Sequence, residues 1–241
     1  MTYPLTAVSG YWAVKNKHKN EYNSWFENTL RINCPYVFFG NSYSIDLVKR
    51  YRRDLPTYYI ECEIDEFYSY KYKDRIIIHP IHCPSVELNI IWNEKIFLLE
   101  KAARLNPYNS EFFTWIDAGI CRFRDKLPPT IPFPNYNNLA LLPKDKFIFT
   151  TAENPVFEPN KLKIYYHYIS ATSYILHKNI IQKFTDTYIE YLEQYLKPDG
   201  IYTDQVILTL IFNDHPELFH NLGHGYGQIV PLLYANDYPV N

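Results

Sequence analysis

The chain has 241 residues, which is enough for one large domain with a hydrophobic core that needs no cross-links. Its composition of 47% hydrophobic and 21% charged residues is ordinary for a globular protein and excludes global disorder. The 24 basic and 26 acidic residues give a net charge of −2, which argues against nucleic-acid binding through bulk charge.

The sequence shows no secretory or membrane-spanning signal. Residues Met1–Leu5 contain neither a basic region nor an apolar one, and the longest apolar stretches, such as Val206–Phe212, are far shorter than the ~20 residues that cross a bilayer. The four cysteines are scattered without a C-x-x-C pair, so we expect free thiols in a reducing compartment. These observations predict a cytoplasmic protein without a transmembrane helix.

Strand-like and helix-like segments alternate through the first half of the chain. Short runs of aromatic and β-branched residues predict four strands, at Leu5–Trp12, Tyr36–Phe39, Thr57–Ile64 and Glu111–Ile116. Apolar residues at helical spacing predict three helices, at Glu21–Leu30, Ser44–Asp54 and Pro84–Leu105. Between them, Arg75–Cys83 is ambiguous, because three successive isoleucines suggest an edge strand and two prolines interrupt it.

The second half continues with a long surface loop, two strands and two helices. These elements are expected at Leu127–Asn138, Phe147–Thr151, Tyr165–Leu176, Asn179–Leu196 and Thr203–Asn213. The alternation of strands and helices predicts a single α/β domain, in which helices flank a mainly parallel central sheet. In such a sheet the ligand site lies at the carboxyl ends of the strands.

Asp117 is the acidic residue best placed for chemistry, because it follows a predicted buried strand and precedes Ala118 and Gly119. A carboxylate at a strand end can hold a divalent cation or a sugar hydroxyl, and small neighbours let a bulky ligand approach the backbone. The structural alternative is an aspartate that ends the strand and caps the next turn. These residues alone leave both interpretations open.

Asp204 and the carboxy-terminal histidines form a second group of candidates. Asp204 falls in the first turn of a predicted helix, where a negative charge is favoured by the helix dipole alone. In the functional alternative, its carboxylate enters the pocket from the side opposite Asp117. His224 lies between two glycines, which suits a metal or phosphate contact. His215 and His220 lie nearby.

Several motifs with a known mechanism are missing. The sequence contains no Walker A loop, no G-x-G-x-x-G, no G-x-S-x-G and no H-E-x-x-H, so phosphate binding by a glycine-rich loop is not expected. The basic run Arg50-Tyr51-Arg52-Arg53 could contact phosphates, but a solvated helix face is the favoured interpretation.

The order of several short motifs resembles the HtrL/YibB (WlaTC) family of glycosyltransferase-like proteins. The motifs that carry the resemblance are Ala7-Val8-Ser9-Gly10-Tyr11-Trp12, Lys17, Tyr22, Trp25-Phe26, Pro35–Gly40, Trp92–Lys95, Trp115–Gly119, Asp204-Gln205 and His215–Phe219. They span most of the chain in a consistent order. The resemblance implies a GT-A-like domain over 1–241, with a nucleotide-sugar-binding half over about 1–120 and an acceptor-binding half over about 121–241.

The resemblance also implies roles for individual residues. Asp204 and Asp117 would be catalytic. Donor binding would fall to Ser9, Gly10, Tyr11, Trp12, Lys95, Asp117, Ala118 and Gly119. Acceptor binding would fall to Asp204, Gln205 and His177. Related enzymes bind a divalent metal, often Mn²⁺, through a D-x-D motif and a histidine near the carboxyl terminus.

In this sequence Asp117 matches the first carboxylate of the D-x-D motif, but Gly119 stands at the third position. We therefore expect a Mn²⁺ site at Asp117 and His224, with His220 as the second choice for the histidine, and strict metal dependence is in doubt. The helix that carries Trp92 and Lys95 should lead directly into the strand that ends at Asp117, which would bring Lys95 within about 11 Å, or two helical turns, of that carboxylate.

Three functions are compatible with these residues. The favoured one is a glycosyltransferase that moves a sugar from a nucleotide-sugar donor to a hydroxyl on a glycan, a lipid-linked sugar or a protein. The second is a nucleotide- or carbohydrate-binding protein that has lost turnover, because the D-x-D motif is incomplete. The third is a metal-dependent hydrolase that uses Asp117 and the carboxy-terminal histidines.

Overall fold

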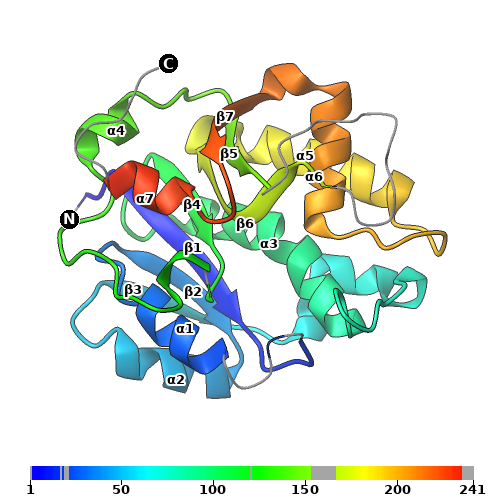
Figure 1. The fold of residues 1–241 in the computed structure, drawn as a ribbon, viewed down its shortest axis with the longest axis horizontal. Helices are drawn as coiled ribbons and strands as arrows, with labels where there is room; N and C mark the ends of the chain where they lie inside the picture. The colour runs from blue at the N-terminus through cyan, green and yellow to red at the C-terminus, as the bar shows by residue number, and fades with distance from the viewer. Residues whose placement is uncertain (1, 17, 19–21, 120, 153–166, 235–241) are drawn as a thin grey trace.

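The computed structural model describes residues 2–16, 18, 22–119, 121–152 and 167–234, and its central feature is one mixed sheet (Figure 1). Its strands are β1 (Leu5–Tyr11), β2 (Tyr36–Gly40), β3 (Thr57–Glu61), β4 (Phe112–Ile116), β5 (Phe147–Thr151), β6 (Ile169–His177) and β7 (Phe219–His224). Their order across the sheet is β3-β2-β1-β4-β6-β5-β7. Within this sheet β6 runs antiparallel to both of its neighbours, and the other neighbouring pairs are parallel.

Successive strands are added on one side of β1 and then on the other, and this change of side positions a ligand crevice. From β1 it moves outward through β2 to β3, and it then returns to place β4 on the other side of β1. Because β1 and β4 are parallel, their carboxyl ends meet at one edge of the sheet. A crevice forms at such a switch point because the connections leave the two strands in opposite directions.

Helices cover both faces of the sheet (Figure 1). The α-helices are α1 (Tyr22–Thr29), α2 (Ser42–Tyr51), α3 (Val86–Leu105), α4 (Tyr136–Ala140), α5 (Lys178–Tyr195), α6 (Asp204–Asp214) and α7 (Ile229–Tyr234). Short 3-10 helices are η2 (Ile64–Glu66), η3 (Tyr68–Arg75), η4 (Cys121–Phe123) and η5 (Pro216–Leu218). The long helix α3 begins where the sequence indicates, because Ser85 caps it by accepting a hydrogen bond from the backbone NH of Leu88.

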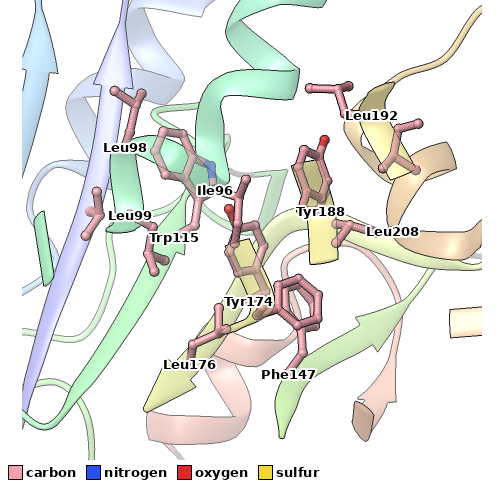
Figure 2. Packing of buried hydrophobic residues seen from close by; sticks show 14 of the residues in the cluster. Ile96, Leu98, Leu99, Trp115, Phe147, Tyr174, Leu176, Tyr188, Leu192 and Leu208 are labelled. Atoms are coloured by element: carbon pink, nitrogen blue, oxygen red, sulfur yellow. The ribbon is translucent and has the colours of Figure 1, made fainter. Parts of the chain in front are cut away.

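The alternation of side chains along the strands divides the core between the two faces. On one face α3, α5 and α6 pack against residues such as Val37, Phe39 and Trp115. On the other face α1, α2, α4 and α7 pack against the intervening strand residues. Figure 2 shows the first of these cores, where the ring of Phe147 stacks on that of Tyr174 with their centroids 4.9 Å apart. Tight aromatic packing on both faces holds the strand ends in fixed positions.

The α/β fold and the neighbouring strands expected from the sequence are confirmed, and two local features were predicted wrongly. The ambiguous segment Arg75–Cys83 forms no edge strand, because Ile76, Ile77 and Ile78 lie in irregular chain after η3. The predicted loop 127–138 contains the start of α4. Strand β7, which ends at the exposed His224, was not predicted, because burial does not alternate along it and its apolar residues are few. The first residues of the predicted strand Tyr165–Leu176 lie outside the described residues, and β6 begins at Ile169.

The amino-terminal ends of the parallel strands are closed by Arg52, which corrects the expectation of a solvated basic face. The Arg52 side chain is buried and stacks on Tyr36, with the guanidinium carbon 3.9 Å from the ring centroid. It donates to the backbone carbonyls of Leu30 at 2.6 Å and Cys34 at 2.7 Å, and to the Thr57 hydroxyl at 2.7 Å. Arg50 and Arg53 remain exposed as expected.

Candidate functional site

A cleft of about 550 Å³ lies at the carboxyl ends of β1 and β4, which is a normal volume for a small-molecule site. Its walls come from the ends of these strands and from the first turns of α3 and α6. Aromatic side chains and polar groups both face it, including Tyr11, Trp92, Asp117, Arg124, His167 and Tyr226. The fold therefore places this cavity at the switch point of the sheet.

Lys95 is held between two carboxylates at this cleft. Its Nζ lies 2.9 Å from Asp117 Oδ1 and 2.9 Å from Asp204 Oδ2, and it also donates to the Ala171 carbonyl at 3.2 Å. The Lys95 and Asp204 side chains are each 6% exposed, whereas the Asp117 side chain is 23% exposed. Of the three groups, Asp117 is therefore the one that a ligand in the cleft can reach.

Burial and the ion pairs have opposing effects on this group of charges. Burial alone would lower the pKa of Lys95, but Asp117 and Asp204 more than offset it, so the pKa is raised and the amine stays protonated. Burial raises the pKa of Asp204 to about 6, although Lys95 acts to lower it. Two carboxylates share one ammonium ion, so the group carries one net negative charge when both are ionised.

Hydrogen bonds fix the orientation of both carboxylates. Asp117 Oδ1 accepts a hydrogen bond from Trp115 Nε1 at 2.7 Å, and the Asp117 backbone NH donates to the Thr172 carbonyl at 2.8 Å. Asp204 Oδ1 accepts from the backbone NH of Gln205 at 2.9 Å. The Gln205 side chain accepts in turn from the backbone NH of Ala171 at 3.2 Å, which ties the start of α6 to β6. The arrangement is preorganised from three separate parts of the chain.

Most of the residues expected at the site line the cleft. Besides Lys95, Asp117 and Asp204, these residues are Gly10, Tyr11, Trp12, Ala118, Gly119 and Gln205. Glycine is required at position 10, because an added Cβ would lie 2.6 Å from the Trp12 ring. Trp12 is fixed by donating from Nε1 to the Cys62 carbonyl at 3.0 Å. The expectation that Lys95 reaches the crevice beside Asp117 is confirmed.

Four of the expected site residues lie elsewhere. Ser9 is buried and donates to the Ile116 carbonyl at 2.7 Å, so it joins β1 to β4 and does not line the cleft. His177 pairs with Phe112 at the opposite end of β4 from Asp117. His220 and His224 lie on β7, three strand positions from β4, and His224 Nδ1 contacts the Thr151 hydroxyl at 3.1 Å.

The described residues do not fit a resident divalent ion at Asp117. Within them, no group of three or more His, Cys, Asp or Glu side chains is arranged to hold a metal ion. The position between the two carboxylates is filled by the Lys95 ammonium, and Asp117 Oδ1 already accepts from Trp115. A hard cation prefers several converging oxygen ligands, which this wall of the cleft does not supply.

Among the cleft residues that reasoning from sequence missed are Arg124, His167 and Tyr226. Arg124 packs its guanidinium over the Trp25 ring, 3.9 Å from the centroid. Tyr226 is presented by Gly225 and Gly227, which adopt φ values of 97° and 69°, and its hydroxyl contacts His167 Nε2. The sequence marks His224 through Gly223 and Gly225, which flank it. The glycines with positive φ are instead Gly225 and Gly227, which flank Tyr226. Nothing in the sequence marks Arg124, because its place depends on packing against α1.

Comparison with protein families supports the resemblance seen in the sequence. Residues 58–229, more than half of the chain, match the model described as "Bacterial protein of unknown function (HtrL_YibB)". The chain belongs to the HtrL_YibB family. A comparison with curated proteins found no match. No helix within the described ranges is long and apolar enough to span a membrane.

The fold of this HtrL_YibB chain is also similar to solved structures. One is mouse xyloside xylosyltransferase 1 in its apo form, with a TM-score of 0.55 and 14% identity over 92% of this chain and 85% of that chain. Streptococcus pneumoniae TIGR4 glycosyltransferase GlyE gives a TM-score of 0.47 and 11% identity over 92% of this chain and 45% of that chain. At 14% identity the first match shows the fold, which is GT-A-like as expected.

Proposed function

We propose that this HtrL_YibB protein is a glycosyltransferase that moves a sugar from a nucleotide-sugar donor to a hydroxyl acceptor. The observation that carries the proposal is the arrangement of Asp117, Lys95 and Asp204 on the wall of the 550 Å³ cleft at the switch point. Its overall fold is similar to that of a xylosyltransferase, which supports the same reaction class. The first half of the chain would hold the donor, and the second half would contribute to the acceptor side.

The geometry gives the two carboxylates different parts in this reaction. Asp117 reaches the cleft and can take the proton that the acceptor hydroxyl loses as its oxygen bonds to the anomeric carbon of the sugar. The bond from that carbon to the diphosphate breaks, and the diphosphate leaves with the electron pair. Asp204 is too deeply buried for this step and instead orients Lys95. Preorganised charges of this kind stabilise a transition state without rearrangement.

The hydrolase alternative receives no support from the site. It relied on Asp117 acting together with the carboxy-terminal histidines, but His220 and His224 lie on β7 and do not line the cleft. The aromatic residues that line the cleft, such as Tyr11 and Trp92, favour a ligand with a base or sugar rings that stack on them.

The test is transfer to an added acceptor, since release of sugar from the donor alone also results from hydrolysis. The wild type is incubated with uridine, guanosine, cytidine and thymidine diphosphate sugars and a panel of glycan acceptors, and products are detected by mass spectrometry. We expect a transfer product with at least one donor. Asp117→Asn keeps the shape and the Trp115 hydrogen bond, so it should fold but lose at least tenfold in transfer rate.

Asp46→Asn is the matched control, because Asp46 is exposed on α2 and pairs only loosely with Lys49 at 3.5 Å. It should transfer at the wild-type rate. Equal rates for Asp117→Asn and the wild type would remove Asp117 from the reaction. Absence of transfer with every donor and acceptor, together with absence of donor binding, would contradict the proposed function.

A further inference from the structure

The cleft contains a second cation, Arg124, that no carboxylate neutralises among the described residues. Arg124 follows η4, and its side chain lines the cleft together with Asp117 and Gly119. Its guanidinium stacks on Trp25, and its Nε is buried without a hydrogen-bond partner in the described parts of the chain. A buried donor without a partner is costly, so such a group is a candidate for binding a ligand.

The backbone around Arg124 is fixed, which distinguishes it from a mobile surface arginine. Asn28 on α1 donates from Nδ2 to the Phe123 carbonyl at 2.9 Å and to the Arg124 carbonyl at 3.5 Å. The Trp25 ring that supports the guanidinium is on the same helix and also contacts the His18 ring, with ring centroids 4.9 Å apart. His18 also lines the cleft. The Arg124 side chain, which lines the cleft, is thus held in place by α1.

Lys95 cannot serve as the cation for a ligand in the same way. Its ammonium is already committed to Asp117, Asp204 and the Ala171 carbonyl. What Lys95 supplies is charge balance, because without it two carboxylates would repel an anion that approaches this wall. Arg124, in contrast, has a planar guanidinium whose geometry matches phosphate oxygens.

We infer that the cleft binds the diphosphate of its donor without a divalent metal ion, with Arg124 as the cation that contacts the phosphates. The expected metal ligands were Asp117 and His224, but Asp117 is paired with the Lys95 ammonium and His224 does not line the cleft. The inference rests on the proposed function, since it takes the ligand to be a nucleoside diphosphate or its sugar conjugate. Beyond the proposed function, the inference names the residue that binds the phosphates and states that binding does not require a metal ion.

The experiment is calorimetric titration of the full chain with the diphosphates of uridine, guanosine, cytidine, thymidine and adenosine, each in excess EDTA and in MnCl₂. We expect at least one to bind in EDTA with a Kd within about threefold of that in Mn²⁺. Arg124→Gln should weaken binding at least tenfold in EDTA, which is about 1.4 kcal/mol. The affinity of Arg124→Lys should fall between those of the wild type and Arg124→Gln, because lysine retains the charge but lacks the planar donor group.

The matched control is Arg104→Gln, since Arg104 is 71% exposed on α3 and pairs with Glu100 at 3.5 Å. It should bind as the wild type does, and melting curves should show that each variant folds. Affinity that depends more than tenfold on Mn²⁺, or equal affinity of Arg124→Gln and the wild type, would overturn the inference and leave the proposed function standing. No binding of any nucleoside diphosphate in either buffer would remove both.

Discussion

A basic side chain is buried at each end of the parallel strands, Arg52 at one and Lys95 at the other, and the two have different kinds of partner. Arg52 at the amino-terminal ends is surrounded by neutral oxygens, and its guanidinium donates to the carbonyls of Leu30, Ile32, Cys34 and Pro56 and to a threonine hydroxyl. Lys95 at the carboxyl ends is paired with two carboxylates, and one of these faces a cleft. One end of the sheet is closed and the other is open.

The difference shows how a buried charge serves structure at one end and a binding site at the other. At Arg52 the hydrogen-bonding groups are matched within the protein, by four backbone carbonyls and a threonine hydroxyl. At Lys95 the opposing charges leave Asp117 partly exposed and one negative charge uncompensated. Buried charges are costly unless they are paired, so Lys95 must be paired at the cleft wall, and one of its two partners, Asp117, stays accessible to a ligand.

Removal of the Arg52 guanidinium should have the largest effect on stability. Arg52→Met leaves at least the carbonyls of Leu30 and Cys34 without their donor inside a closed core, so we expect unfolding free energy to fall by about 3–5 kcal/mol. Urea unfolding measures the change in unfolding free energy. Arg52→Lys is the control, which keeps the charge and should lose less stability than Arg52→Met. A loss below about 1 kcal/mol in Arg52→Met would show that the closed end does not depend on this side chain.

Lys95→Met should have the next largest effect, through the carboxylates that it leaves behind. We expect a loss of about 2–4 kcal/mol at pH 7.5, because Asp204 stays buried without its cation. The double variant Lys95→Met/Asp204→Asn should recover at least half of that loss, since it removes the uncompensated charge. Urea unfolding of the four proteins in this cycle measures the coupling, and purely additive effects would contradict the pairing.

Glu94, the neighbour of Lys95 on α3, belongs to the scaffold and should give stability a pH dependence. Its carboxylate accepts hydrogen bonds from the backbone NH groups of Tyr68 and Ser69, and burial raises its pKa to about 7. The folded state then holds a proton that the unfolded chain releases near pH 4.5, so this contribution is greatest below pH 4.5 and is lost as the pH rises through 7.

The expected size of this Glu94 contribution is roughly 3 kcal/mol between pH 4.5 and 8. The measurement is the melting temperature of wild type and Glu94→Gln across that range, because glutamine does not titrate. The variant should be less stable overall, since it retains one acceptor oxygen for three donors, but its curve should be flatter. If the melting temperatures of the two proteins change with pH in parallel, the group responsible for the pH dependence is not Glu94.

The smallest effect should come from Ser9, which joins the two strands that end at the cleft without lining it. Ser9→Ala removes the hydrogen bond to the Ile116 carbonyl and should cost about 1 kcal/mol while leaving nucleoside diphosphate affinity unchanged. Gly10→Ala is the matched neighbour, because its Cβ would collide with Trp12 on the cleft wall and should weaken binding. Weaker binding in Ser9→Ala alone would return Ser9 to the site.

The candidate site was predictable from the sequence where strand ends decide it. Asp117 follows a run of buried residues, and any residue there must lie at the carboxyl edge of a parallel sheet. Lys95 could be placed beside it because α3 leads directly into β4. The histidines could not be placed in the same way, since β7 pairs with β5 through a long-range contact that no local pattern indicates.

The sequence by itself determined the α/β class, the order of the main elements and the carboxylates at their ends, because these depend on local periodicity and on short connections. Tertiary structure alone decided that Arg52 is buried, that Lys95 bridges Asp117 and Asp204, and that Arg124 reaches the cleft. Each of these depends on side chains from distant segments meeting in three dimensions. The free energy of a buried charge is set by those partners and not by its neighbours in the chain.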